Sequence, residues 1–335
     1  MISHPWLGLA FFFIKVIIIV IAIIVILAVF FSLLTRNKTK KKRGIQITRL
    51  NKHYDDQKQQ LEQALCASKT ELKQQKKAGK KKKKTKKQAK SKPHLFVLDF
   101  KGDIKAEAVD NFREEITMVL TKAQKTDEIF VRVESPGGLV HAYGLAASQL
   151  QRIRERDIPL TVAVDKVAAS GGYMMACVAN KIIAAPFAII GSVGVLAQLP
   201  NFHRLLKKHD IDFEQITGGK YKRTLTLFGE NTDQDRQKMQ EEVNEIHQLF
   251  ADFVKQQRPQ IDIDRVATGE HWPAIQAKNL QLVDDIITSD DYLLNAAESH
   301  TIVHIETIVK QKLMAKLMGQ ARSELTQMNQ WQWLK

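Results

Sequence analysis

The stretch EIFVRVESPGG, residues 128–138, runs from a hydrophobic strand pattern into a turn that contains proline and paired glycines. The stretch LTVAVDKVAASGGY, residues 160–173, repeats that arrangement one unit later. Helical patterns at 106–123 and about 142–156 precede the two stretches. Strands that alternate with helices in this way pair in parallel through crossover helices. The sequence therefore predicts an α/β fold with a parallel sheet.

The same alternation extends on both sides and sets the limits of the predicted domain. Further strand and helix patterns lie at 95–100, 170–180, 181–185, 232–257, 273–279, 282–287 and 291–299. We expect four segments: a membrane anchor at 1–35, a basic and partly helical or disordered linker at 36–92, the α/β domain at 93–300, and a C-terminal extension at 301–335.

The net charge of +15 comes from one segment of the chain. Residues 36–92 contain 22 Lys and Arg against 4 Asp and Glu, so the rest is close to neutral, which argues against a basic nucleic-acid-binding face on the domain. Within that segment, residues 73–92 hold 12 lysines, and such a run repels itself and cannot bury a core. Beside a membrane anchor, we expect its partner to be anionic lipid headgroups. Nucleic-acid contact and a plain solvated spacer are the alternatives.

Residues 16–34 are predicted to cross a membrane. The run is uncharged and, as a helix, about 28 Å long, close to the hydrocarbon thickness of a bilayer. No small-residue cleavage pattern follows it, so we expect an uncleaved single-pass anchor. Six Lys and Arg lie within residues 36–43 and none within residues 1–6, which favours a cytoplasmic position for the rest of the chain.

A second uncharged run, residues 182–199, has the hydropathy of a membrane segment. It contains Pro186, Gly191 and Gly194 and directly follows a predicted helix of the α/β domain. We therefore interpret it as a buried strand and loop.

Two glycine-marked turns follow predicted strands. In the first, at 135–138, paired glycines allow positive φ and a close approach to the backbone. In the second, Ser170 precedes Gly171 at a strand-to-helix junction, where free N–H groups and the helix dipole favour an oxyanion. Either turn alone is most simply a loop with a serine N-cap. Together they point to a nucleophilic serine at position 170.

A nucleophilic serine needs a base, and a lysine can serve where burial lowers its pKa towards neutrality. A third glycine-marked turn, GGKYKR at 218–223, follows a predicted strand at 213–217. Spacing does not decide which of its lysines, Lys220 or Lys222, faces Ser170.

Other reactive side chains offer weaker candidates. His141 is the histidine nearest to a motif, yet no histidine lies in a strand-end or glycine-rich context, so we expect solvated histidines. Lys166 is the lysine nearest to Ser170 in sequence and is expected on the surface. Cys66 and Cys177 are isolated, and no Cys or His spacing suits a metal, so we expect no metal and no cofactor.

Four motifs resemble the signal peptide peptidase A family of Ser–Lys serine proteases: SPGG at 135–138, AASGGY at 168–173, GSVGV at 191–195 and GKYK at 219–222. They occur in that family's order and spacing, and the similarity covers about residues 94–290. The anchor and the lysine-rich insert are similar to its SohB-like subgroup, proteases of the inner membrane of Gram-negative bacteria. The resemblance implies a crotonase/ClpP-like fold of ββα units and a homo-oligomer.

The resemblance also implies roles for individual residues. Ser170 would be the nucleophile, Lys222 the general base, and Ser192 the residue that orients the Lys222 amine. The backbone N–H groups of Gly137 and Gly171 would form the oxyanion hole. The implied function is an endopeptidase that hydrolyses peptide bonds in membrane-derived or unfolded peptides. Some family members split the dyad between two duplicated domains, whereas this chain carries both residues in one.

Two other classes remain as alternatives. A crotonase-fold acyl-CoA enzyme would also stabilise an oxyanion but would not need the serine and the lysine together. A catalytically silent scaffold would use only the anchor and the linker to bind the membrane.

Overall fold

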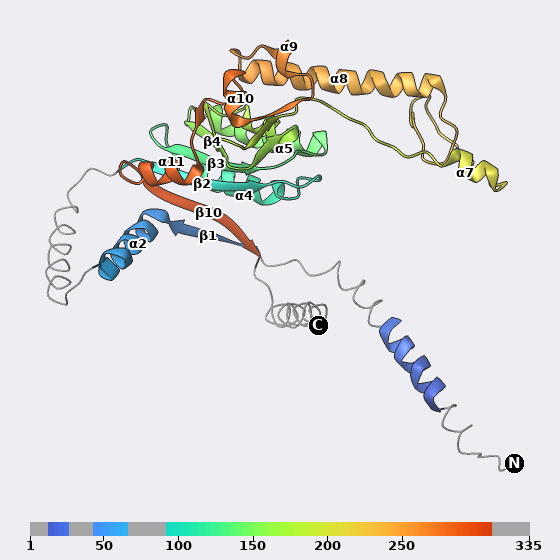
Figure 1. Ribbon diagram of the computed structural model, residues 1–335, viewed down its shortest axis with the longest axis horizontal. Helices are drawn as coiled ribbons and strands as arrows, with labels where there is room; N and C mark the ends of the chain where they lie inside the picture. The colour runs from blue at the N-terminus through green and yellow to red at the C-terminus, as the bar shows by residue number, and fades with distance from the viewer. Residues whose placement is uncertain (1–12, 27–42, 66–91, 310–335) are drawn as a thin grey trace. The chain divides into compact units, whose positions relative to one another are not determined.

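The computed structural model describes residues 13–26, 43–65 and 92–309 (Figure 1). The chain divides into two compact units, and the one at 45–307 holds the sheets and the helices packed on them.

The predicted anchor at 16–34 lies partly outside the described residues. Residues 13–26 are helical, and no helix in the described ranges is both long and apolar enough to cross a membrane. The lysine-rich run at 73–92 also lies outside them, except for its last residue.

A seven-stranded sheet forms the centre of the unit at 45–307. In spatial order its strands are β1 (Arg43–Arg49), β10 (Thr301–Val309), β2 (His94–Lys101), β3 (Glu128–Glu134), β4 (Leu160–Val164), β6 (Lys181–Ala184) and β9 (Asp285–Ile286). Every pairing from β10 to β9 is parallel. The register aligns Leu95 with Glu128 and Ile129 with Leu160. The predicted mixed α/β fold with a parallel sheet is therefore confirmed.

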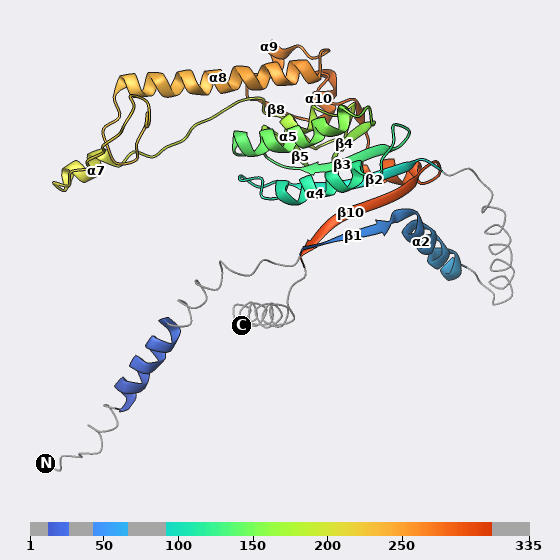
Figure 2. The same ribbon diagram turned by 180° about the vertical axis from the view of Figure 1, so that it is seen from behind.

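Helices cover both faces of this sheet (Figure 1 and Figure 2). Alternate residues of a strand point to opposite faces, and in β2 Phe96 and Leu98 join the larger core while Leu95 and Val97 join the smaller one. The larger core is closed by α4 (Val109–Leu120), α5 (Val140–Arg154) and α6 (Gly171–Ala176), and the smaller by α11 (Ser289–Ala296) and the start of α2 (Leu50–Leu65). Burial on both faces explains why the central strands are mainly hydrophobic.

A second, three-stranded sheet leads directly into Ser170 and Ser192. Its order is β5 (Val167–Ala169), β7 (Ile189–Gly191) and β8 (His271–Pro273), with β5 and β7 parallel and β8 antiparallel. The uncharged run at 182–199 supplies β6, β7 and a following loop, and Ile182 and Ile190 are fully buried. The interpretation as part of the α/β core is confirmed for the two strands, whereas the loop that follows is exposed from Leu196 to Leu199.

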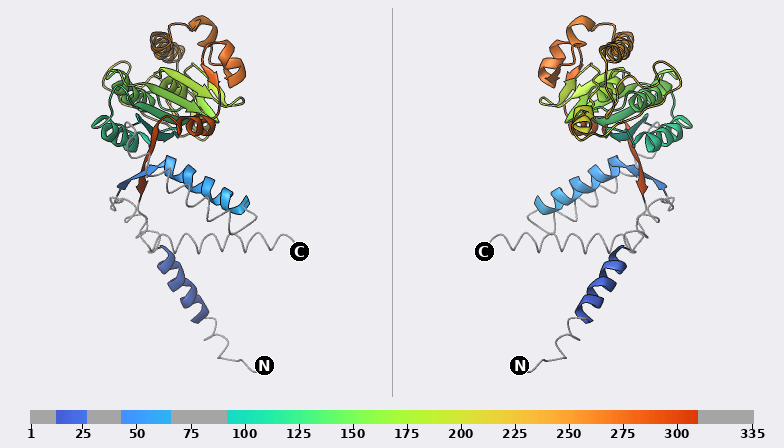
Figure 3. Two further views of the ribbon diagram at one scale, coloured as in Figure 1. Left: turned by 90° about the vertical axis from the view of Figure 1, so that its left-hand side faces the viewer. Right: turned by 90° about the vertical axis from the view of Figure 1, so that its right-hand side faces the viewer.

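The helix α8 (Asp233–Gln257) is the longest described element, at about 36 Å from its rise per residue. A capping box between Thr232 and Asp235 starts it. Its buried residues, Phe250, Ala251 and Val254, all lie in its C-terminal half, where it packs on α6. Figure 3 views this helix nearly along its axis, above the sheet.

Residues 195–232, which we call the arm, fold against the N-terminal half of α8 and include α7 (His203–Lys208) (Figure 1). Asn201 Nδ2 donates to the carbonyls of Thr226 and Gly229, at 2.9 and 3.0 Å. The Lys238 amine of α8 lies 5.5 Å from the centre of the Tyr221 ring. The arm is therefore held by its own hydrogen bonds and by the exposed end of α8.

The remaining elements are α9 (Ile263–Val266) and α10 (Ala274–Asn279). Three parts of the chain differ from expectation. Residues 43–49, within the linker predicted to be partly helical or disordered, form the strand β1 of the large sheet. The sheet extends past the predicted domain limit at residue 300, because β10 pairs with β2. Residues 213–217, predicted as a strand, have no regular secondary structure; the Phe213 ring instead packs 5.7 Å from that of Phe228 within the arm.

Candidate active site

The turn at 135–138 is tied directly to the second sheet. The Ser135 N–H donates to Val167 O at 2.8 Å, and the Ser135 carbonyl accepts from the Ala169 N–H at 3.0 Å. Gly137 then takes a φ of +92°, which glycine adopts without steric cost. The two glycine-marked turns predicted from sequence are thus neighbours.

Ser170 forms a sharp elbow between β5 and α6. Its backbone has φ 52° and ψ −119°, a conformation that costs a residue with a side chain about 1–3 kcal/mol. Hydrogen bonds hold it there: the Ser170 N–H donates to Gly191 O at 2.8 Å, and its carbonyl accepts from the Met174 N–H at 2.9 Å. The side chain is half-buried and does not cap the helix. Strain at an elbow that presents a hydroxyl is typical of a nucleophile.

Gly137 and Gly171 lie against this serine. A Cβ on Gly137 would come within 2.7 Å of Ser170 Cβ and 2.8 Å of Gly171 N. A Cβ on Gly171 would overlap the ring of Tyr143. Glycine is therefore needed at both positions because another residue would separate the turn, the serine and the helix start.

The Gly137 N–H already has a partner in this chain. It donates to Ser135 Oγ at 3.1 Å, and that hydroxyl lies 2.5 Å from Tyr143 Oη. The Tyr143 hydroxyl in turn donates to Asp103 O at 2.8 Å. Sequence reasoning missed this buried network, because a serine before a turn and a tyrosine on a helix carry no spacing signal.

Ser192 follows β7 directly, next to the residue that accepts from Ser170. It has a φ of +55°, and its N–H donates to Glu270 O at 2.6 Å. A Cβ on Gly191 would come within 2.9 Å of the Trp272 ring, so this tryptophan packs on the strand end that holds both serines.

The structure does not bring Lys222 to Ser170. Lys222 is exposed, in the arm, and its backbone N–H closes the glycine-marked turn on Gly219 O at 3.2 Å. The neighbouring Tyr221 contacts Lys238, which lies about 24 Å along α8 from the buried Val254 at a rise of about 1.5 Å per residue. The amine and the hydroxyl of the predicted dyad are therefore on separate parts of this chain.

Two weaker candidates are placed as expected. Lys166 is exposed and pairs with Glu134, at 3.0 Å from Nζ to Oε1. His141 is exposed at the start of α5.

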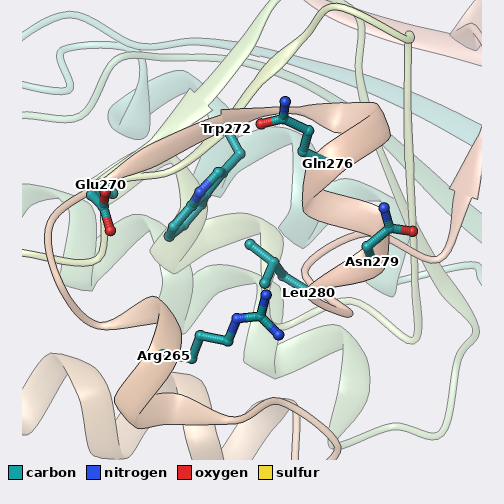
Figure 4. A pocket seen from close by; sticks show the side chains of 6 residues that line it. All are labelled: Arg265, Glu270, Trp272, Gln276, Asn279 and Leu280. Carbon is teal, nitrogen blue, oxygen red and sulfur yellow. The ribbon is translucent and has the colours of Figure 1, made fainter.

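A pocket of about 350 Å³ lies between α9, β8 and α10 (Figure 4). Its lining residues are Arg265, Glu270, Trp272, Gln276, Asn279 and Leu280. None of the predicted catalytic residues lines it, but two of its lining residues, Glu270 and Trp272, contact the strand end beside Ser170.

Two charged clusters stabilise the surrounding elements. The buried Arg258 guanidinium, just after α8, donates to both carboxylate oxygens of Asp284 and to Gln281 O, at 2.7–2.9 Å. On β2, burial acts to raise the pKa of Asp99, but hydrogen bonds from His304 and Arg132 outweigh it and lower that pKa to about 2. These clusters fix α8 and β10 relative to the sheet.

Comparison with known sequences identifies similar proteins along most of the chain. The model of the family described as "Peptidase family S49 N-terminal" matches residues 7–150, and that of "Peptidase family S49" matches residues 152–303. A protein named "Probable protease SohB" from Haemophilus influenzae is 56% identical over 227 residues, which cover 68% of this chain and 64% of that protein, slightly less than two thirds of its length. A protein of the same name from Buchnera aphidicola subsp. Schlechtendalia chinensis is 46% identical over 306 residues, covering 86% of this chain and 98% of that one.

Among solved structures, a membrane-bound stomatin-specific protease called 1510-N is similar with a TM-score of 0.41 and 18% identity. The alignment covers 62% of this chain and 85% of that chain.

Proposed function

Because the chain belongs to peptidase family S49, and within it is SohB-like, we propose that it is a membrane-anchored serine endopeptidase with a crotonase/ClpP-like fold. Ser170 is the nucleophile, and Lys222 is the general base. The observation that carries the proposal is the strained elbow at Ser170, whose Cβ lies close to the Gly137 backbone and whose side chain takes no part in capping α6.

The proposed reaction is acyl transfer through an enzyme ester. Ser170 Oγ adds to the carbonyl carbon of the peptide bond while its proton moves to the Lys222 amine. The N–H groups of Gly137 and Gly171 face the oxyanion, and removal of one such donor typically costs about 10²–10³ in rate. The C–N bond then breaks, and the ammonium returns its proton to the leaving amine. A water molecule releases the acyl group by the same sequence, with Ser192 orienting the amine.

The position of Lys222 supports a dyad that is completed between copies of the chain. Within one copy, the arm that carries Lys222 packs on the end of α8 remote from α6. The arm also exposes large apolar side chains: Leu196, Leu199, Phe202, Leu205, Ile211, Phe213, Ile216, Leu227 and Phe228. A second copy would cover this surface and receive the lysine. We therefore propose a homo-oligomer in which Lys222 of one copy serves Ser170 of the next.

Three apolar side chains around the turn at 135–138 support a peptide substrate of apolar character. Ile104, Leu139 and Val140 are exposed, and the Ile104 carbonyl accepts from the Leu139 N–H at 2.8 Å. Membrane-derived or unfolded peptides would bury this surface. With an inner-membrane anchor and a lysine-rich linker on anionic headgroups, the enzyme would act close to the bilayer.

A serine-reactive fluorophosphonate probe tests the proposal. The full-length wild-type chain in detergent should take the label and hydrolyse unfolded casein, and Ser170→Ala and Lys222→Ala should each lose both. Lys220→Ala is the matched control, since Lys220 belongs to the same exposed turn, and it should keep the label. A wild-type chain that neither labels nor cleaves would favour the silent scaffold, and label that persists in Ser170→Ala would remove this serine from the mechanism.

A further inference from the structure

The side chain of Tyr143 lies fully buried directly beneath the candidate oxyanion hole. Its ring occupies the space that a side chain on Gly171 would need. Its hydroxyl reaches the Ser135 hydroxyl, which is also fully buried. Tyr143 therefore contacts both the turn at 135–138 and the start of α6, which carry the two proposed oxyanion donors.

The hydrogen bonds around this hydroxyl have one consistent direction. The Tyr143 hydroxyl donates its only hydrogen to Asp103 O. The Ser135 O–H must then donate to Tyr143 Oη, and Ser135 Oγ is free to accept from the Gly137 N–H. Burial raises the pKa of the Tyr143 hydroxyl, so it remains a donor throughout the neutral range. The direction of the Gly137 amide thus depends on Tyr143 through one intervening hydroxyl.

The backbone leaves room for this chain of hydrogen bonds. A Cβ on Gly102 would lie 2.7 Å from Ser135 Oγ and would also overlap the tyrosine hydroxyl. A Cβ on Gly138 would overlap the backbone of Ile104, in the loop whose Asp103 carbonyl accepts from Tyr143. The tyrosine therefore links that loop, the turn at 135–138 and the start of α6.

We propose that Tyr143 is a positioning residue for the reaction: through Ser135 it sets the direction of the Gly137 N–H, and through its ring it seats Gly171 against Ser170. The inference rests on the proposed function. In the resting chain the Gly137 amide is held by a long hydrogen bond of 3.1 Å, and a developing oxyanion is the stronger, charged acceptor for the same N–H. Tyr143 keeps that amide close to its working direction before substrate arrives, so little reorganisation remains in the transition state.

We call the hydrogen bonds from Tyr143 through Ser135 to the Gly137 N–H the relay. Tyr143→Phe tests the relay alone, because it keeps the ring beneath Gly171 and removes only the hydroxyl. Tyr173→Phe is the matched control: Tyr173 is equally buried, and its hydroxyl donates to Leu282 O at 3.0 Å, away from the turn. We expect both variants to lower the melting temperature to a similar degree. Tyr143→Phe alone should lower kcat on casein and the rate of fluorophosphonate labelling about tenfold, with KM changed less than about twofold, as for a loss confined to the transition state.

A double-mutant cycle with Ser135→Ala completes the test. If the two hydroxyls act as one relay, Tyr143→Phe combined with Ser135→Ala should lose no more labelling rate than the worse single variant. Multiplying losses, or a Tyr143→Phe rate equal to that of Tyr173→Phe, would overturn the relay while leaving the nucleophile assignment intact. An unlabelled wild-type chain, or a labelled Ser170→Ala chain, would instead refute the proposed function itself.

Discussion

Replacing Ser170 with glycine should stabilise the protein while abolishing its activity. The residue has φ 52° and ψ −119°, which is the first central position of a type II′ turn and is favourable only for glycine. A residue with a side chain is strained there by about 1–3 kcal/mol, and glycine removes this strain. Its greater freedom in the unfolded chain offsets about 0.5–1 kcal/mol of that gain. The net expected gain is about 1 kcal/mol.

Ser170→Ala separates strain from the loss of the hydroxyl. Alanine keeps the Cβ and therefore the strain, and the hydroxyl that it removes does not cap α6, so its stability should stay close to that of the wild type. The assay is thermal unfolding of the full chain in detergent, where about 1 kcal/mol corresponds to about 2–4 °C for a domain of this size. A Ser170→Gly chain that melts no higher than Ser170→Ala would refute the idea that this elbow stores strain.

Two further predictions concern stability. Arg258→Met should destabilise the fold by about 3–5 kcal/mol, because it leaves the Asp284 carboxylate without its buried partner; urea unfolding measures this, and Arg265→Met, an exposed arginine, should change it little. Asp99 has a pKa of about 2 against 3.8 unperturbed, so it contributes stability above about pH 4 that is lost as pH falls towards 2. That contribution is about 2 kcal/mol, and Asp99→Asn should flatten the decline of the unfolding free energy between pH 4 and 2; identical declines would contradict the assignment.

Much of the fold could be predicted because its central strands are buried on both faces. Strands such as β3 and β4 are mainly apolar, and the helices between them have clear periodicity, so the predicted elements agree with those of the structure. The strands β1 and β10, which lie at one side of the sheet, could not be found in this way. Their sequences, RGIQITR and TIVHIETIV, mix polar and apolar residues, and β10 pairs with a strand some 200 positions earlier.

In the candidate site, too, the residues with a local sequence signal could be predicted, and the position of Lys222 could not. Glycines at turns carry a local signal, and the structure places Gly137, Gly171 and Ser192 around Ser170. The position of Lys222 depends on how the arm folds against α8, which no local pattern encodes, and its role therefore stays a prediction.

In the proposed oligomer, the hydroxyl of Ser170 and the amine of Lys222 meet across an interface between two copies of the chain. Ser170→Ala and Lys222→Ala chains carrying different affinity tags can be assembled together, and mixed oligomers recovered through both tags. We expect fluorophosphonate to label the Lys222→Ala chains in these mixed oligomers and to leave each homo-oligomer unlabelled. Mixed oligomers that assemble but take no label, beside a wild type that does, would contradict this expectation.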